Sequence, residues 1–335
     1  MKSNRLLLTL AWLLVAWVSK AQYTEDILGA TYQQQTICMP DDYEGKTVST
    51  LVRKAEPQTG RRAILYIHGY NDYFFQAQLG DSVAAHGYNF YALDLRKYGR
   101  SLLPNQDAFY CRSLDEYFAD IDTAIALIQK EGSREIILMG HSTGGLISSY
   151  YLKHHPQAPV VGLALNSPFL DWNFGWFMES VAIPTVSFLG KFFPDWIIQG
   201  TSGDASYAKS LLQTFKGEWT FDTSLKMPLG HPKKAGWIRA IHSAQQDIQD
   251  ECAIQCPILL LSSTRSYSET NEWHDEYMSS DIVLSVDDIQ KFGKQLGSNV
   301  TAREIEGGIH DLILSPKPAR DHTYQILFGW LDSIK

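Results

Sequence analysis

From about Arg62 onward, short apolar runs alternate with segments whose apolar residues recur at helical spacing. Alternating strands and helices with short connections imply parallel crossovers and a sheet that is covered on both faces. The fold class is therefore α/β, with a mostly parallel, doubly wound sheet. Strands are expected at 63–69, 88–95, 135–140, 160–168, 257–263 and 300–306, and helices at 74–87, 114–132, 144–155, 235–249, 285–297 and 321–334.

Two segments depart from this alternation. Near the N-terminus, residues 29–39 and 47–55 flank a polar turn, and this pattern predicts an antiparallel hairpin. Between about 169 and 232 the pattern is irregular and rich in Trp and Phe, and we expect an inserted helical cap over one edge of the sheet. With 335 residues, 44% of them hydrophobic, the chain can bury one large core, so residues 22–335 are predicted to form a single domain with this insertion.

The first 21 residues have the layout of a secretory signal peptide. Two basic residues precede an apolar stretch from Leu6 to Val18, and residues 19–21 offer a small-x-small cleavage site. An uncleaved membrane anchor is the alternative, but the apolar stretch is short for a membrane span. We therefore expect an exported protein, periplasmic or secreted, without a stable membrane span after cleavage of residues 1–21.

An exported protein can keep disulfides, so the four cysteines are candidates for pairing. Cys252 and Cys256 are close enough in sequence to pair with each other. Four cysteines allow three connectivities, however, and the sequence does not choose among them or exclude free thiols at Cys38 and Cys111. No histidine or second cysteine pair stands at ligand spacing beside them, so a metal site is not predicted.

The most informative motif is Gly140-His-Ser-Thr-Gly144, which has the form G-x-S-x-G between an expected strand and an expected helix. The glycines would allow a tight, strained turn that presents Ser142 at the top of the sheet. The amide of Thr143 could then face an oxyanion, helped by the dipole of the following helix. Ser142 is thus the candidate nucleophile. The alternative is that Ser142 has no catalytic role and is only a small hydroxyl residue in a glycine-rich turn.

At this motif the chain resembles the α/β-hydrolase superfamily, and within it the serine hydrolases similar to monoacylglycerol lipase and lysophospholipase (the serine aminopeptidase S33 type). Their elbow commonly reads G-H-S-M-G-G, whereas this one reads G-H-S-T-G-G. The stretch YIHGYNDYF resembles the family's His-Gly turn, which implies a second oxyanion amide at Tyr70. The stretch ALDLRKYGRS resembles the D-x-R-G-x-G-x-S loop, with Lys97 where Gly is usual. The resemblance spans about Arg62 to the C-terminus.

Three polar residues in these stretches are expected to be structural. His68 should shape its turn, because the backbone amide does the chemical work there. Asp94 and Arg96 should form an ion pair or anchor their loop. That loop precedes the nucleophile strand, whereas the triad order in this fold is Ser, then acid, then His.

His310 is the predicted base, because a serine hydroxyl needs a group that takes its proton. It follows the last expected strand and precedes the last expected helix, behind two glycines. His141 neighbours Ser142 in sequence but should point away from it. His274 is expected on a surface loop and His322 in the final helix.

The acid of the triad is harder to place. The resemblance implies a carboxylate just after the strand at 257–261, but residues 264–266 there are Thr, Arg and Ser. Asp281 precedes an apolar pair before the next helix, as the family's acid does, and only one helix and one strand separate it from His310. We predict Asp281, with Asp275 as the main alternative. The other candidates are Glu269, Glu272, Glu276, Asp287 and Asp288, or no acid at all.

These residues together predict hydrolysis of a carboxylic ester through an acyl-enzyme, with Ser142, His310 and Asp281 as the triad and with no metal or organic cofactor. The aromatic insertion suggests an apolar, lipid-like monoester such as a monoacylglycerol or lysophospholipid, unless its aromatics only pack the cap. The net charge is -8 and the sequence contains no cluster of basic residues, which argues against a nucleic-acid partner.

Two other functions stay open. An exported aminopeptidase or amidase of the same fold would need an acidic group in the cap to hold the substrate amine, and Glu179, Asp195 or Asp204 could serve. A non-catalytic binding protein on a hydrolase scaffold is the second alternative.

Overall fold

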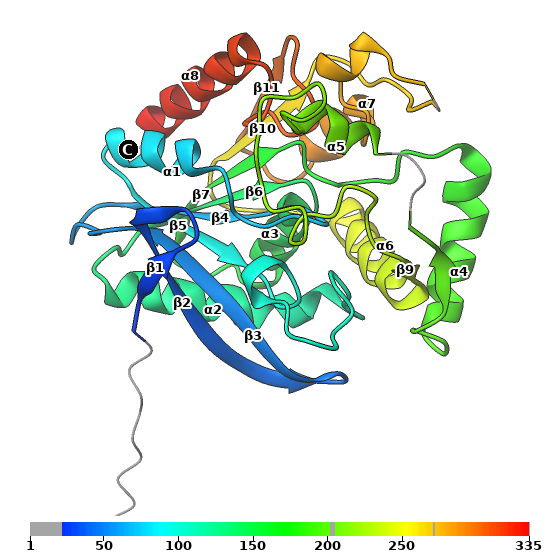
Figure 1. The fold of residues 1–335 in the computed structure, drawn as a ribbon, viewed down its shortest axis with the longest axis horizontal. Helices are drawn as coiled ribbons and strands as arrows, with labels where there is room; N and C mark the ends of the chain where they lie inside the picture. Colours follow the sequence, from blue (N-terminus) through cyan, green and yellow to red (C-terminus); the bar gives the residue numbers. More distant parts are fainter. Residues whose placement is uncertain (1–21, 202–204, 271, 335) are drawn as a thin grey trace, which may run out of the picture.

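A nine-stranded, mostly parallel sheet organises the chain (Figure 1). The computed structural model describes residues 22–201, 205–270 and 272–334, so the expected signal peptide lies outside the described residues. The strand order is β1-β2-β3-β5-β4-β6-β7-β10-β11. The six strands from β5 to β11 in this order are parallel, and they are β4 (Ala63–Ile67), β5 (Asn89–Asp94), β6 (Ile136–His141), β7 (Val160–Asn166), β10 (Ile258–Ser263) and β11 (Val300–Ile305).

Each face of the sheet buries its own apolar core, because successive side chains of a strand point to opposite faces. In β4, Leu65 and Ile67 enter one core, and Ile64 and Tyr66 enter the other. Figure 1 shows the two helical layers on either side of the sheet. The first core is covered by α2 (Phe118–Lys130), α3 (Thr143–His154), α6 (Ala235–Asp250) and α7 (Val286–Gly293), and the second by α1 (Ala77–Ala85) and α8 (Lys317–Ser333). The expected doubly wound sheet is confirmed.

The N-terminal hairpin is also confirmed. Strands β2 (Gly29–Asp42) and β3 (Gly45–Lys54) pair antiparallel, and β3 joins the sheet by pairing antiparallel with β5. A short strand, β1 (Thr24–Asp26), extends the edge. Ser113 and Glu116 form a capping box that opens a 3₁₀ turn (Leu114–Tyr117) before α2 begins.

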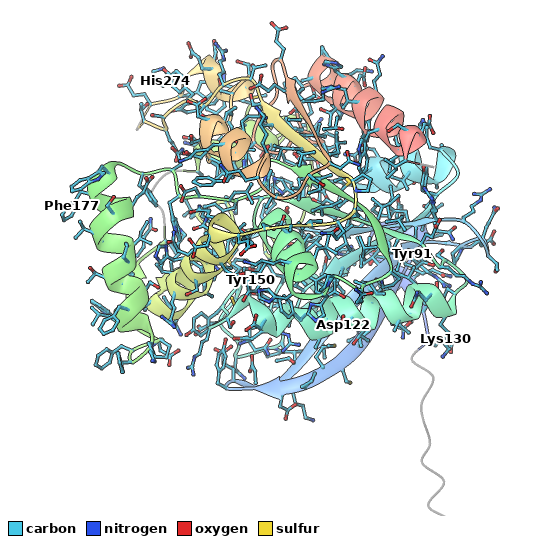
Figure 2. All side chains as sticks on the ribbon, turned by 180° about the vertical axis from the view of Figure 1, so that it is seen from behind. Tyr91, Asp122, Lys130, Tyr150, Phe177 and His274 are labelled. Atoms are coloured by element: carbon cyan, nitrogen blue, oxygen red, sulfur yellow. The ribbon has the colours of Figure 1, made fainter. Side chains whose placement is uncertain are left out.

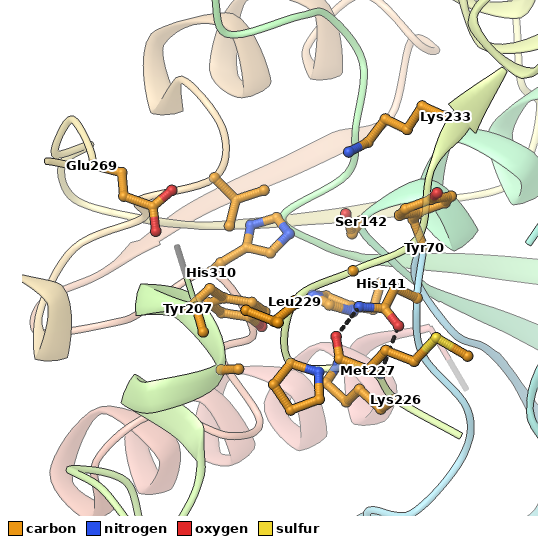
Figure 3. A pocket seen from close by; sticks show the side chains of 16 residues that line it. Tyr70, His141, Ser142, Tyr207, Lys226, Met227, Leu229, Lys233, Glu269 and His310 are labelled. Carbon is orange, nitrogen blue, oxygen red and sulfur yellow. Dashed lines mark hydrogen bonds between the residues drawn. The ribbon is translucent and has the colours of Figure 1, made fainter. Parts of the chain in front are cut away.

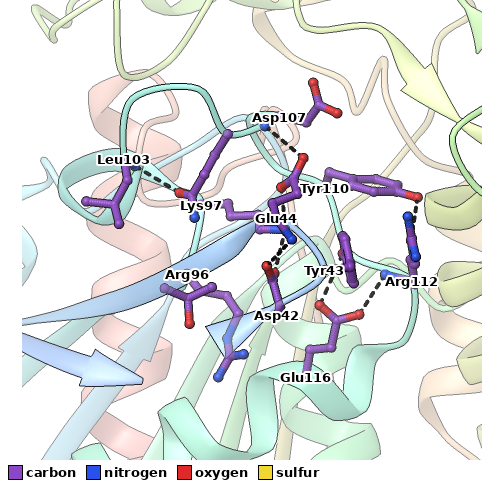
Figure 4. Close-up of polar contacts among 12 residues, drawn as sticks. Asp42, Tyr43, Glu44, Arg96, Lys97, Leu103, Asp107, Tyr110, Arg112 and Glu116 are labelled. Carbon is purple, nitrogen blue, oxygen red and sulfur yellow. Dashed lines mark hydrogen bonds and ion pairs between the residues drawn. The ribbon is translucent and has the colours of Figure 1, made fainter. Parts of the chain in front are cut away.

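The tip of the hairpin is tied to the loop after β5 by Lys97 (Figure 4). Lys97 has a φ of 65°, which is the conformation a glycine adopts without strain. Its ammonium is fully buried 2.6 Å from Asp42 and 2.5 Å from Glu44, so two carboxylates of the hairpin compensate it. This ion-pair cluster explains how a lysine can occupy a position where similar loops have glycine.

The insertion lies between β7 and α6. It contains a π-helical turn (Met178–Ala182), α4 (Ile183–Gly190), β8 (Ile197–Gln199) and α5 (Ser206–Leu211). Helix α4 packs along α6, and β8 pairs antiparallel with β9 (Lys233–Lys234) just before α6 begins. Among the described residues, no helix combines the length and the apolar character that crossing a bilayer requires.

All four cysteines are free thiols in the structure, so the pair that Cys252 and Cys256 could form is not made. Cys38 is exposed on β2 and Cys111 is buried, and burial raises the pKa of the Cys111 thiol above its usual range. Cys252 and Cys256 are near in sequence but remain unpaired. The two apolar cores on the sheet faces, a third apolar cluster around Phe75 and Leu211, and buried polar contacts hold the fold together.

Candidate active site

Ser142 occupies a strained turn between β6 and α3. Its φ of 52° and ψ of -119° are unusual for a residue with a side chain. Its side chain is 7% exposed, and α3 begins at the next residue, Thr143. The first amides of a helix have no acceptor within it, so the amide of Thr143 is available to an anion beside Ser142.

The glycines of the motif are required by close backbone contacts around this turn. A Cβ at Gly140 would stand 2.5 Å from the carbonyl oxygen of Gly144, and a Cβ at Gly144 would stand 2.3 Å from the carbonyl oxygen of His68. A Cβ at Gly69 would lie 3.1 Å from the Cβ of Ser142. The turn that carries Tyr70 therefore passes directly beside the serine.

Ser142 opens into a cavity of about 220 Å³ at the carboxyl edge of the parallel strands (Figure 3). Its floor contains His141, Ser142 and His310, and Tyr70 and Asn71 come from the loop after β4. The insertion supplies the opposite wall through residues 205–230, including Tyr207 on α5, and the ring of Tyr207 meets the ring of His310 edge-on at 5.5 Å. Lys233 and Glu269 lie at two sides of the cavity in Figure 3.

His310 and Asp281 are hydrogen-bonded in the floor of this site. The distance between His310 Nδ1 and Asp281 Oδ2 is 2.8 Å, and the two residues are 2% and 0% exposed. The other carboxylate oxygen of Asp281 accepts the amides of Val283 and Leu284, each at 2.8 Å. The carboxylate is thereby fixed in orientation and fully hydrogen-bonded, as a buried charge requires.

Asp281 reaches His310 because a long loop returns to the tip of β10. Ser266 pairs with Asp281 in an isolated bridge, the amide of Tyr267 donates to the carbonyl of Asp281, and the amide of Asp281 donates to the carbonyl of Arg265. The carboxylate therefore stands beside the position where the resemblance implied an acid. Asp275 instead lies exposed on a 3₁₀ turn (Asp275–Met278), where it accepts the indole N–H of Trp273. His274 lies at the periphery (Figure 2), and His322 is exposed on α8.

His141 differs from its expected orientation, because it lines the cavity and its ring centre lies 5.0 Å from that of His310. Its Nδ1 lies 3.6 Å from Asp72 and 4.0 Å from Asp311. These three side chains place possible ligand atoms within 4.8 Å of one another, which is the spacing of a metal site. The Lys226 ammonium, however, already contacts Asp72 at 2.8 Å, and Asp311 accepts from Asn166 at 2.7 Å. Asp72 and Asp311 thus already have protein partners, and Lys226 compensates the charge of Asp72.

The loop after β4 is clamped by the end of the insertion. The side-chain amide of Asn71 donates to the carbonyl of Met227 at 2.7 Å and accepts the Met227 amide at 2.8 Å. Next to it, Lys226 is 6% exposed and pairs with Asp72. Burial would raise the pKa of Asp72, but the Lys226 ammonium and His141 outweigh it and hold that pKa below its usual value. Sequence reasoning missed this clamp, because a lysine and a carboxylate 154 positions apart give no local signal.

The three residues expected to be structural have defined partners. His68 bonds the carbonyl of Gly69 through Nδ1 and the amide of Leu95 through Nε2, so it shapes the turn as predicted. Burial lowers the pKa of His68, which favours a neutral ring. Asp94 and Arg96 do not pair with each other. Asp94 pairs with Arg100, whereas Arg96 pairs with Asp120 of α2.

The Trp and Phe residues of the insertion do not form the cavity wall as expected. The buried ones include Phe169 and Trp172 at the start of the segment and Phe221 near its end. Figure 2 shows Phe177 turned outward at the edge of the molecule. Phe215 is more than half exposed, and so are seven aromatic side chains on and around α4: Phe174, Trp176, Phe177, Phe188, Phe192, Phe193 and Trp196. These rings form an aromatic surface on and around α4 rather than a lining over Ser142.

The acidic residues considered for an amine site are also away from the cavity. Glu179 accepts the amide of Phe174, and Asp195 pairs with Arg112 on the surface. Asp204 lies outside the described residues. The carboxylate that does line the cavity is Glu269, on the loop after β10.

A strained serine between a parallel strand and a helix, facing a buried histidine at the same sheet edge, is the arrangement of an α/β-hydrolase. The family model described as serine aminopeptidase S33 matches residues 58–317. The chain belongs to this family of α/β-hydrolase enzymes, and the resemblance found in the sequence is confirmed.

Solved structures share the fold at low sequence identity. The monoacylglycerol lipase of Paleococcus ferrophilus has a TM-score of 0.59 and 19% identity, with 83% of this chain and 97% of that chain covered. A soluble variant of monoglyceride lipase from Saccharomyces cerevisiae, in complex with a substrate analog, has a TM-score of 0.63 and 16% identity over 94% and 99% of the two chains. A carboxyl esterase from Bacillus coagulans has a TM-score of 0.58 and 14% identity over 90% and 98%.

Among curated proteins, the chain is similar to the AB hydrolase superfamily protein YisY of Bacillus subtilis (strain 168). The identity is 33% over 108 residues, which is 32% of this chain. The match spans only 37% of that relative's length.

Proposed function

We propose that the protein is a serine hydrolase that cleaves carboxylic esters through an acyl-enzyme. Ser142 is the nucleophile, His310 the general base and Asp281 the acid that orients His310. The hydrogen bond of 2.8 Å between His310 and Asp281, in the cavity that also exposes the strained Ser142, is the observation that carries the proposal.

The geometry supports a definite order of proton transfers. Asp281 holds the proton of His310 on Nδ1, so Nε2 is free to accept the proton of Ser142 as its oxygen attacks the ester carbonyl. The amides of Tyr70 and Thr143 then stabilise the oxyanion. His310 next protonates the leaving alcohol, and it afterwards activates the water that releases the acid product and frees Ser142.

A lipid-like monoester is the proposed substrate class. The similar structures include two monoacylglycerol or monoglyceride lipases, and the aromatic surface around α4 is suited to apolar aggregates. A second cavity of about 180 Å³ adjoins the active site and is lined by Phe109, Tyr110 and Trp237. It shares Tyr70 with the first cavity, so an apolar chain bound there would lie next to the oxyanion loop.

We also propose that the protein is exported after removal of residues 1–21, on the strength of the charge and hydropathy pattern of that segment. Expression of the full chain followed by N-terminal sequencing of the protein outside the cytoplasm tests this. The expected new N-terminus is Gln22, and an intact N-terminus in the cytoplasm would contradict it.

Labelling with a fluorophosphonate probe tests the nucleophile. The wild-type chain should be labelled and Ser142→Ala should not, whereas Ser148→Ala, which removes a buried hydroxyl of α3, should retain labelling. Absence of labelling in the wild type would favour a non-catalytic binding protein.

Parallel assays with 4-nitrophenyl acyl esters and with aminoacyl 4-nitroanilides test the bond that is cleaved. Ester turnover that is lost in Ser142→Ala is the expected result. Faster turnover of aminoacyl anilides would favour the aminopeptidase alternative, to which the family model's description also points.

A further inference from the structure

Lys233 presents a positive charge to the active-site cavity without a protein counter-ion. It lies in β9 and lines the cavity together with Ser142 and Tyr70 (Figure 3). In residues 22–201, 205–270 and 272–334, no carboxylate comes within the 4.0 Å of an ion pair with its ammonium. Its one aromatic contact is with the ring of Tyr70, whose centre is 5.7 Å away.

The other lysines near the site are compensated. Lys226, which also lines the cavity, is paired with Asp72 at 2.8 Å. Lys234 follows Lys233 directly and contacts Asp107 and Asp195. Both lysines line the adjoining cavity, but Lys233 alone of the two also lines the cavity of Ser142, and Lys234 is the one that carboxylates compensate. Of these three lysines, Lys233 is therefore the one without a carboxylate partner among the described residues.

An ammonium that is half-buried without a partner is destabilised relative to water. Burial lowers the pKa of Lys233, and no carboxylate acts in the opposite direction. A negatively charged ligand should bind such an ammonium favourably, because the folded protein has already desolvated the ammonium before the ligand arrives. Its place between Ser142, Tyr70 and the adjoining apolar cavity puts that charge close to the scissile bond.

We propose that Lys233 makes this site selective for esters that carry an anionic group, a carboxylate or a phosphate, close to the ester bond. The proposal rests on the proposed ester hydrolysis at Ser142 and narrows its substrate class to anionic monoesters. It also disfavours an aminoacyl substrate whose ammonium group lies on the Lys233 side of the cavity, away from Glu269.

Two matched substrate pairs test the proposal and separate the two anions. The first pair is mono-4-nitrophenyl glutarate and 4-nitrophenyl pentanoate, which differ by a carboxylate in place of a methyl group. The second is a 1-acylglycerol 3-phosphate and the 1-monoacylglycerol with the same short acyl chain, both assayed as monomers. The readout is the ratio of kcat/KM for the anionic member to kcat/KM for the neutral member.

Wild type should favour the anionic member of at least one pair, and Lys233→Met should lower that ratio by at least about 10-fold, as expected for the loss of one charge-assisted contact. Lys233→Arg should keep most of the ratio. Lys191→Gln, which removes an exposed charge at the end of α4, should leave it unchanged. A response in the glutarate pair alone identifies a carboxylate, and one in the phosphate pair alone identifies a phosphate.

The proposal is overturned if Lys233→Met leaves both ratios unchanged or lowers the turnover of both members of each pair equally. Fluorophosphonate labelling of each variant shows that the nucleophile remains intact. Failure of the parent proposal looks different, because the wild type would then hydrolyse neither member of either pair or Ser142→Ala would retain activity.

Discussion

Two buried histidines, His310 and His141, lie next to Ser142. Each is near at least one buried carboxylate, but the contacts that they make differ. His310 meets Asp281 at 2.8 Å through one ring nitrogen, and no second carboxylate is within ion-pair distance among the described residues. His141 lies 3.6 Å and 4.0 Å from Asp72 and Asp311, and neither of its ring nitrogens has a hydrogen-bond partner among the described residues.

The difference lies in the other hydrogen bonds and ion pairs that the carboxylates make. Asp281 uses one oxygen for two loop amides and keeps the other for His310. Asp72 is engaged by Lys226, and Asp311 by Asn166 and by the amide of Ile313. The second oxygen of Asp72 is unbonded, but it lies 3.6 Å from His141 Nδ1, which is beyond hydrogen-bond distance. Proximity to the serine is therefore not enough to make a histidine the base.

The largest expected effect separates the two histidines directly. His310→Gln should reduce kcat on a 4-nitrophenyl ester by about 10⁴- to 10⁶-fold, because loss of the base alone costs nearly as much as loss of the whole triad. His141→Gln should cost far less, since that ring accepts no proton in the proposed reaction. Comparable losses in the two variants would reverse the assignment of the base.

The second prediction compares carboxylates. Asp281→Asn should lower kcat by about 10⁴-fold, because the amide favours the wrong tautomer of His310, with little change in KM. Asp275→Asn, on its exposed turn, is the matched control and should retain wild-type kcat. Full activity in Asp281→Asn would remove that residue from the triad.

The third prediction concerns the contribution of the ion pair between Asp72 and Lys226, next to His141, to folding stability. Asp72→Asn should lower the free energy of unfolding by about 3–5 kcal/mol near neutral pH, because the buried Lys226 ammonium loses its partner. The double variant Asp72→Asn/Lys226→Met should recover part of this loss. Urea unfolding at neutral pH measures both, and a double variant less stable than the single one would contradict the ion-pair explanation.

The smallest effect is the pH dependence of that same contribution. The pKa of Asp72 in the folded state lies below its usual value of 3.8, so its ion pair stabilises the protein fully above about pH 4. The contribution should diminish as the pH falls below that value and the carboxylate becomes protonated. The difference in unfolding free energy between wild type and Asp72→Asn should therefore shrink on acidification, and a constant difference would show that Asp72 is not the titrating group.

The sequence predicted the elements of the site better than their contacts. The order of strand, Ser142, helix and the late His310 follows from hydropathy and glycine spacing, which are local. The prediction that His141 points away from Ser142 is wrong, because its ring packs 5.0 Å from that of His310 and lines the same cavity. The aromatics of the insertion were expected over Ser142, but their exposure depends on how α4 packs against α6, which composition does not encode.

The amino-acid sequence by itself determined the α/β class, the N-terminal hairpin and the strained turn at Ser142, since periodicity and steric limits act over a few residues. Only the tertiary structure decided which carboxylate reaches His310, that Lys226 clamps the loop of Asp72, and that Lys233 stands uncompensated in the cavity. Each of these depends on loops that return from distant parts of the chain, and the free energy of such contacts is set by burial and by competing partners rather than by sequence spacing.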